Sequence, residues 1–225
     1  MPERSESRTT EHARLDAEAR ERSLCILGGF HPETDDGLPQ GTGTLLLLGP
    51  DEPRFWPVLQ ASREWRDGGP DPVDRWSSRV IGGWARELGA VALFPFGGPP
   101  FRPFIRWALR SGNLHASPIG LLVHSRAGLF VSIRGALALQ TRIDLPQPES
   151  SPCARCVGRP CKSACPVDAF DGVAYDVAAC KVYLETPFGS DCMERGCKAR
   201  RACPVSQDFG RLPEQSAYHM KVFRG

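Results

Sequence analysis

Cysteine is concentrated in one part of this chain, and that concentration restricts what the chain can fold into more than any other feature. Of nine cysteines in 225 residues, Cys25 stands alone and the other eight lie between Cys153 and Cys203. The first 22 residues are polar and lack the apolar segment of a secretory signal, so we expect a cytoplasmic chain, in which thiols stay reduced. In that setting, clustered cysteines indicate metal binding rather than disulfides.

The eight clustered cysteines fall into two closely spaced groups that are separated by a single cysteine. The first group is Cys153, Cys156, Cys161 and Cys165, the isolated residue is Cys180, and the second group is Cys192, Cys197 and Cys203. Proline follows the last cysteine of each group. It fixes the backbone there and directs the chain away from the site.

In the bacterial two-cluster arrangement, the cysteine that precedes proline in each group binds the cluster of the other group. Applied here, this rule gives each of two [4Fe–4S] clusters four thiolates and leaves no cysteine over. The first cysteine set is then Cys153, Cys156, Cys161 and Cys203, and the second cysteine set is Cys165, Cys180, Cys192 and Cys197. The alternative is a pair of structural zinc sites, in which two cysteine knuckles usually flank a longer loop.

Charge adds an expectation about partners. The formal net charge of +2 is too small to indicate a nucleic-acid partner, and no apolar run reaches the roughly 18 residues of a membrane span. Basic residues do crowd the second group: Arg195, Lys198, Arg200 and Arg201. They favour a reduced cluster and fit an acidic redox donor or acceptor protein, although a solvated basic turn is the alternative.

The sequence before the clustered cysteines predicts a domain that contains both helices and strands. Three prolines in 145–152 mark a linker, so we expect a polar tail over 1–22 without an apolar face, an α/β domain over 23–148 and a cysteine module over 149–225. Apolar runs predict strands over 23–27, 44–48, 90–94, 119–124 and 129–133. Helical patterns cover 52–66, 73–88 and 103–110.

Residues 153–204 resemble the ferredoxin-type module of epoxyqueuosine reductases and reductive dehalogenases, including the isolated Cys180. The spacings are looser, with two extra residues before Cys161 and in each gap of the second group. Residues 117–137 carry a weaker resemblance to the segment that precedes the clusters in epoxyqueuosine reductase. The resemblance implies an α+β chain: a nitroreductase-like layered α/β domain followed by a small bacterial-type 2[4Fe–4S] ferredoxin module. It also implies a cobalamin held by the first domain.

One departure from that family bears on activity. The family's proposed proton donor is an aspartate in an Asp-Ser-x-Pro segment, and the matching stretch here, residues 96–100, carries Gly97. Glycine cannot act as a general acid. We therefore expect an electron-transfer protein, with a corrinoid- or flavin-dependent reductase as the alternative, and no catalytic residue is assigned.

Other features are weaker indications of a site. The aromatic segment Phe94–Phe104 either lines a pocket for a flat ligand or packs one domain onto another. We expect Cys25, which lies in an apolar run, to be a small core residue, and His31, His115 and His124, which lack ligand spacing, to be structural or exposed.

Overall fold

The computed structural model describes the backbone of residues 3–172 and 174–225, with side chains from residue 11 onward. The chain forms two compact units. The first unit comprises Met1–Leu114 and Ser132–Glu149, and the second comprises His115–Val131 and Ser150–Gly225. One boundary falls in the predicted linker, but segment 115–131 belongs to the second unit instead of the expected 23–148 domain.

A four-stranded antiparallel sheet forms the centre of the first unit, in the order β1-β2-β6-β3. Its strands are β1 (Leu24–Phe30), β2 (Thr44–Pro50), β3 (Val91–Leu93) and β6 (Gly135–Leu139). Central β2 pairs with β6 so that Leu46 faces Leu137. The four consecutive leucines 45–48 are all at 0% exposure, as expected for a strand that is covered on both faces.

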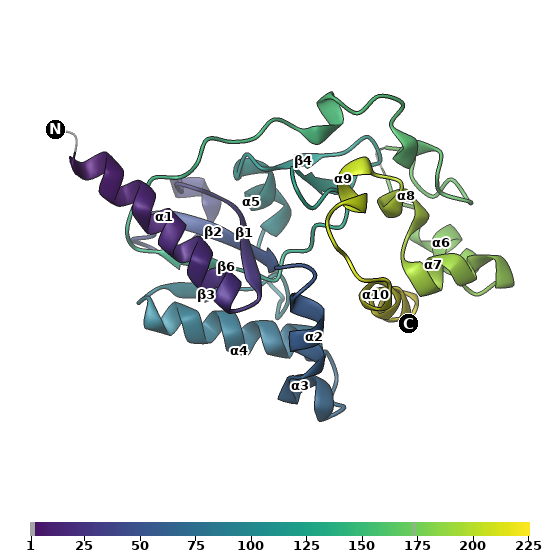
Figure 1. The fold of residues 1–225 in the computed structure, drawn as a ribbon, viewed down its shortest axis with the longest axis horizontal. Coiled ribbons are helices and arrows are strands. Elements are labelled where there is room, and N and C mark those ends of the chain that lie inside the picture. Colours follow the sequence, from purple (N-terminus) through teal and green to yellow (C-terminus); the bar gives the residue numbers. More distant parts are fainter. Residues whose placement is uncertain (1–2, 173) are drawn as a thin grey trace. The chain divides into compact units, whose positions relative to one another are not determined.

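Three of the helices of the first unit, α1, α4 and α5, pack on this sheet. The helices are α1 (Glu3–Glu21), α2 (Phe55–Gln60), α3 (Arg63–Arg66), α4 (Pro72–Glu87) and α5 (Phe104–Arg110). Helix α1 packs against β1, and α4 packs against β3 and β6 (Figure 1). The α4 helix buries Trp76, Ile81 and Trp84, which lie three to five residues apart and so share one helix face.

Three sequence expectations for this unit were wrong. No strand forms over 129–133; the strand of that region is β6, which begins two residues later. The helix expected over 52–66 is split: α2 ends at Gln60, and Ser62 caps the start of α3 by accepting a hydrogen bond from the Trp65 N–H at 3.4 Å. The segment 1–22 is not a tail without an apolar face, since Leu15 and Ala19 of α1 are buried.

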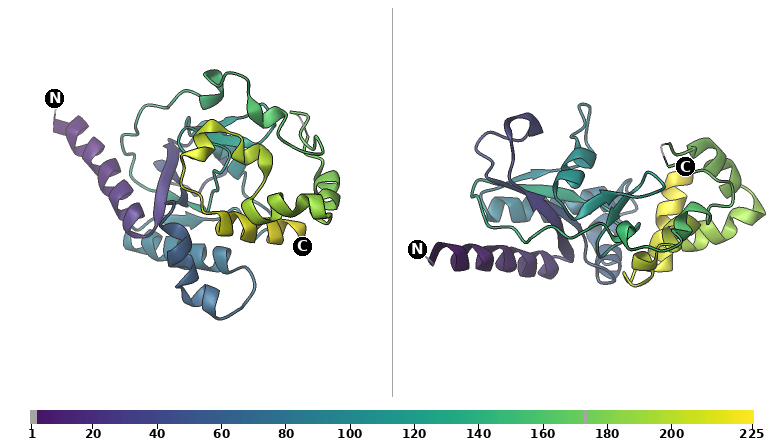
Figure 2. Two further views of the ribbon diagram at one scale, coloured as in Figure 1. Left: turned by 45° about the vertical axis from the view of Figure 1, so that its right-hand side comes forward. Right: turned by 90° about the horizontal axis from the view of Figure 1, so that it is seen from above.

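The loop between β1 and β2 carries the short 3₁₀ helix η1 (Thr34–Asp36) and stands out from the sheet in the right-hand view of Figure 2. It is tied to α5. Arg110 Nη1 donates to both carboxylate oxygens of buried Asp36 at 2.7 and 2.6 Å, and Trp107 Nε1 donates to its carbonyl at 3.0 Å. These bonds hold an otherwise open loop in one conformation.

The second unit contains short elements. Strand β4 (Leu114–Ala116) begins on the last residue of the first unit and pairs with β5 (Leu122–His124). The other elements are η2 (Pro152–Ala154), η3 (Pro160–Lys162), α6 (Val177–Leu184), η4 (Pro187–Gly189), α7 (Ser190–Arg195), α8 (Lys198–Arg201), α9 (Pro204–Gln207) and α10 (Pro213–Arg224). Helices α7 and α10 lie side by side (Figure 1).

The chain is therefore a mixed α and β protein with small antiparallel sheets. The predicted mixture of helices and strands is confirmed. Every helix in the part of the chain that the structure describes is too short or too polar to cross a lipid bilayer.

A buried ion pair that joins α3 to α4 provides a test of the first unit. Glu64 is 4% exposed, and its carboxylate accepts hydrogen bonds from Arg79 at 2.5 and 2.9 Å and from Arg63 at 3.0 Å. The Arg79 bonds hold the pKa of Glu64 well below its usual value. We expect Glu64→Gln to lower the free energy of unfolding at pH 7 by about 2 kcal/mol, since hydrogen bonds to charged groups are worth roughly that much.

The pH dependence of that difference follows from the lowered pKa. The stabilisation is complete above the unfolded-state pKa of about 4.5 and declines as the pH falls from there through the lower folded-state value. Urea unfolding followed by tryptophan fluorescence measures it, because all five tryptophans lie in the first unit. The control is Glu87→Gln, which removes an exposed pair with Arg22. An equal loss in both variants would contradict the prediction.

Candidate metal centre

A cavity of about 410 Å³ in the second unit is lined by all four cysteines of the first set. Cys153 lies in η2 and Cys161 in η3, with Cys156 in the loop between them, whereas Cys203 directly precedes α9. The cavity thus brings together cysteines from the beginning and from the end of the cysteine region. Cys203 lies with the first group, as the crossed arrangement of the sequence analysis expects.

Proline and glycine give these short turns their shape. Pro152, Pro160 and Pro204 each open a helical turn, where the fixed φ of proline suits the first position and its missing N–H costs nothing. Between Cys156 and Cys161 the chain passes through positive φ at Gly158 and Arg159. The loop can therefore reverse within a few residues and present two thiols to one cavity.

The ionisation of the thiols shows which cysteines act on one another. Burial raises the pKa of Cys161, and the charges of Cys153, Cys203 and Cys156 raise it further. Burial likewise raises the pKa of Cys153, followed by the charge of Cys203. A hydrogen bond from Ser151 opposes that rise.

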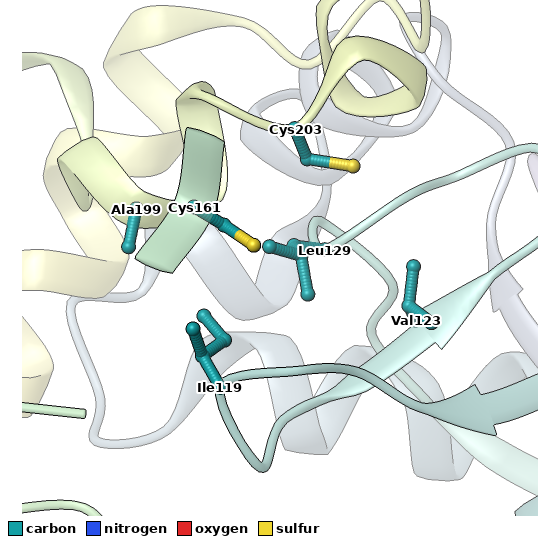
Figure 3. Close-up of a cluster of buried hydrophobic side chains, with 6 residues drawn as sticks. All are labelled: Ile119, Val123, Leu129, Cys161, Ala199 and Cys203. Atoms are coloured by element: carbon teal, nitrogen blue, oxygen red, sulfur yellow. The ribbon is translucent and has the colours of Figure 1, made fainter. Parts of the chain in front are cut away.

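An apolar layer from the segment 115–131 packs on this cavity. Ile119, Val123 and Leu129 form a buried cluster with Ala199 and with the two buried cysteines of the first set, Cys161 and Cys203. Figure 3 shows the Cys161 sulfur directed toward Leu129. Water is excluded from this side of the cysteines, which lowers the local dielectric and strengthens electrostatic interactions there.

The backbone of segment 115–131 packs closely against α9, which directly follows Cys203. The Leu129 N–H donates to Ser206 Oγ at 2.8 Å. A β-carbon at Gly128, whose φ is +56°, would lie 2.5 Å from the Ser206 backbone nitrogen. Only glycine fits that position without displacing α9.

The second cysteine set comes from four segments of the same unit. Cys180 lies in α6, Cys192 in α7 and Cys197 just before α8, while Cys165 follows η3. Burial raises the pKa of Cys180, and the charges of Cys197, Cys165 and Cys192 raise it further. The structure therefore gathers the first set in one cavity, and the grouping of the second set and the ligand roles of all eight cysteines stay a prediction.

Within residues 3–172 and 174–225, no three His, Cys, Asp or Glu side chains form a group that could hold a metal ion. A four-iron cluster takes one cysteine at each iron. Two sets of four thiols are the donor set that two such clusters require.

The basic residues near the second group are used within the unit. Asp191 forms ion pairs with Arg195 at 3.5 Å, with Lys198 at 3.6 Å and with Arg201. Arg200 donates to the Leu129 carbonyl at 2.7 Å. These four basic side chains therefore all have partners within the unit, although a single carboxylate serves three of them.

Two site-related side chains were missed by sequence reasoning. Ser151 opposes the rise in the pKa of Cys153 that burial causes, and Tyr175 opposes that of Cys180. A serine two residues before a cysteine carries no recognisable signal, and Tyr175 precedes Asp176, the N-cap of α6.

The remaining candidates have structural partners. The Cys25 thiol donates to the Pro50 carbonyl at 3.3 Å. His124 is buried, and its Nδ1 accepts from the N–H groups of Arg126 and Ala127 at 3.2 and 3.1 Å, which shapes a turn. His31 Nε2 lies 2.8 Å from the Ile143 carbonyl. For these three residues the structural expectation is confirmed.

The aromatic segment Phe94–Phe104 lines a separate cavity of about 540 Å³ in the first unit. Phe94 stacks on Phe96 with ring centres 5.1 Å apart, Phe104 is buried, and Phe101 is 69% exposed. Gly97 also lines the cavity, and a β-carbon there would meet no atom within 4 Å. The cobalamin implied by the family resemblance stays a prediction for this cavity.

No protein-family model, no curated protein and no solved structure matches this chain. The functional argument therefore depends on the geometry of the two cysteine sets.

Proposed function

We propose that this protein binds two [4Fe–4S] clusters and transfers single electrons. The observation that carries the proposal is the cavity in which Cys203 joins Cys153, Cys156 and Cys161. The charges that Cys197, Cys165 and Cys192 exert on Cys180 support the second set. Crossing of the cysteine before proline is the hallmark of two-cluster ferredoxins. We propose on the same basis that the second unit is a ferredoxin-type module and the first a nitroreductase-like domain.

In this proposal each cluster supplies reversible one-electron chemistry, and the chain supplies its environment. The cysteines act as ligands and not as nucleophiles. Ile119, Val123 and Leu129 exclude water from the first set. Around the second set, burial raises the pKa of Cys192, and the positive charges of Lys198 and Arg201 oppose that rise, because positive charge favours the thiolate form.

A redox partner is expected at the cavity of the first set. Its rim carries Arg155, Val157 and Arg159; all three are exposed, Val157 at 96%. Residues 150–167 also contain Lys162 and no acidic residue. An apolar residue between uncompensated positive charges fits an acidic electron carrier, because complementary charge steers such encounters.

Metal content is the first test. We expect about eight irons and eight acid-labile sulfides per chain after anaerobic purification, from four cysteines per [4Fe–4S] cluster. Iron and sulfide analysis with the visible absorption spectrum measures this. Stoichiometric zinc without iron would replace the proposal by the structural zinc alternative.

The crossed arrangement is tested by single substitutions. We expect Cys203→Ala and Cys165→Ala each to lose about half of the iron, since each removes one of four ligands from a different cluster. Cluster-specific EPR signals of the reduced variants should be complementary, each lacking the signal that the other keeps. Cys25→Ala is the control and should keep full iron content, because Cys25 lies in β1. Loss of the same signal in both variants would show that the cysteines are distributed differently between the two clusters.

The partner surface is tested by charge reversal. We expect Arg155→Glu combined with Arg159→Glu to slow electron exchange with an acidic flavodoxin about tenfold at low ionic strength, and less as salt rises. Stopped-flow absorption measures the rate. The control is Lys221→Glu with Arg224→Glu, which makes the same charge change on exposed residues of α10. Equal slowing in both double variants would exclude a localised surface.

A further inference from the structure

Two serine hydroxyls line the cavity of the first cysteine set. Ser117 and Ser125 lie in the wall of the same cavity as the four thiols. Ser117 is 7% exposed, and the Oγ atoms of both serines are closed to solvent. In the part of the chain that the structure describes, neither Oγ atom has a hydrogen-bond partner. A buried hydroxyl without a partner gives up its hydration without compensation, so two of them in one cavity indicate a ligand that accepts hydrogen bonds.

The backbone holds both serines in turns. Ser117 directly follows β4, and its N–H donates to the Leu121 carbonyl at 2.9 Å. Ser125 directly follows β5, in a turn that His124 and Gly128 close with two backbone hydrogen bonds of 3.0 Å. Each hydroxyl is therefore attached to a part of the backbone that is already fixed by its own hydrogen bonds.

The neighbouring side chains of this wall are apolar. Ser117 lies two residues before Ile119, and Ser125 lies two residues after Val123. Ile119 and Val123 belong to the same buried layer as Leu129, which packs on the cysteines (Figure 3). Aliphatic side chains offer no hydrogen-bond acceptor, and their low dielectric strengthens any hydrogen bond formed beside them. An acceptor for the two hydroxyls is therefore expected among the groups that the cavity binds.

The donor set of the cavity supplies such an acceptor. The sulfurs of a [4Fe–4S] cluster accept hydrogen bonds, which are one of the means by which a protein sets the cluster potential, and a serine hydroxyl carries one donor. We propose that Ser117 and Ser125 donate hydrogen bonds to the sulfurs of the first cluster and raise its reduction potential. The inference rests on the proposed function. Reduction adds negative charge to the sulfurs, and a hydrogen bond to a charged acceptor is stronger, so both hydroxyls stabilise the reduced state more than the oxidised one.

The two donors act at the cavity that a partner protein is expected to reach. The rim of this cavity carries Arg155, Val157 and Arg159, which are all exposed. A higher potential at the first cluster keeps an electron at this rim until an acidic carrier binds there.

The test is a redox titration of the anaerobically purified holoprotein, monitored by EPR. The reduction step that disappears in Cys203→Ala identifies the first cluster, because Cys203 belongs to the first set. We expect Ser117→Ala and Ser125→Ala each to lower the midpoint of that step and to leave the other step unchanged. In each variant the ratio of reduced to oxidised cluster at a fixed potential should fall about tenfold, or about 59 mV for one electron.

A matched control and a conservative variant complete the design. Ser163→Ala removes the hydroxyl of an exposed serine between Cys161 and Cys165, and it should leave both midpoints unchanged. Ser117→Thr keeps a hydroxyl at the cavity and should keep the wild-type midpoint. Because the two serines lie in different turns, Ser125→Ala still decides the question if Ser117→Ala assembles poorly.

The outcomes separate this inference from the proposed function. Absence of iron in the wild-type protein would overturn the proposed function itself. Full iron content with both midpoints unchanged in the two cavity variants would overturn only the role of the serines, and would show that their hydroxyls bond to water instead. An equal shift of both reduction steps would also overturn that role, since it would show a general effect rather than bonds to one cluster.

Discussion

The structure of the second unit depends on thiols that are brought together in apolar surroundings. Burial raises the pKa of Cys153, Cys161, Cys180 and Cys192, so in the bare chain the neutral thiol is favoured at these positions. Several thiolates in a region of low dielectric repel one another and lose hydration. A cationic inorganic core would remove that cost, and its binding would release protons and contribute to folding.

The rest of the second unit supports that arrangement. Its helices α7, α8 and α9 are four to six residues long, too short to be stable by themselves. They are held by specific contacts instead: Asp191 gathers three basic side chains, and Ser206 bonds to the backbone beside Gly128. A unit with little regular structure is consistent with a fold organised around its ligands.

The two cysteine sets and much of the first unit can be predicted from the sequence, because both predictions use residues that are close together along the chain. The spacing of the cysteines and the proline after Cys165 and Cys203 point to the crossed sets, and the apolar run 44–48 identified the central strand. What it missed depends on contacts between distant residues. The burial of Leu15 and Ala19 needs β1 as a partner, and the strand at 135–139 needs β2 and β3 to pair with.

The placement of segment 115–131 has a consequence for synthesis. The chain enters the second unit, returns to the first for β6, and enters the second again after Glu149. Ile119, Val123 and Leu129 leave the ribosome well before Ala199 and Cys203, the residues with which they are buried. During that interval their apolar side chains lack native partners, a state prone to misassembly. The first unit can form its sheet as soon as β6 is made, whereas the cysteine unit must wait for its last helices.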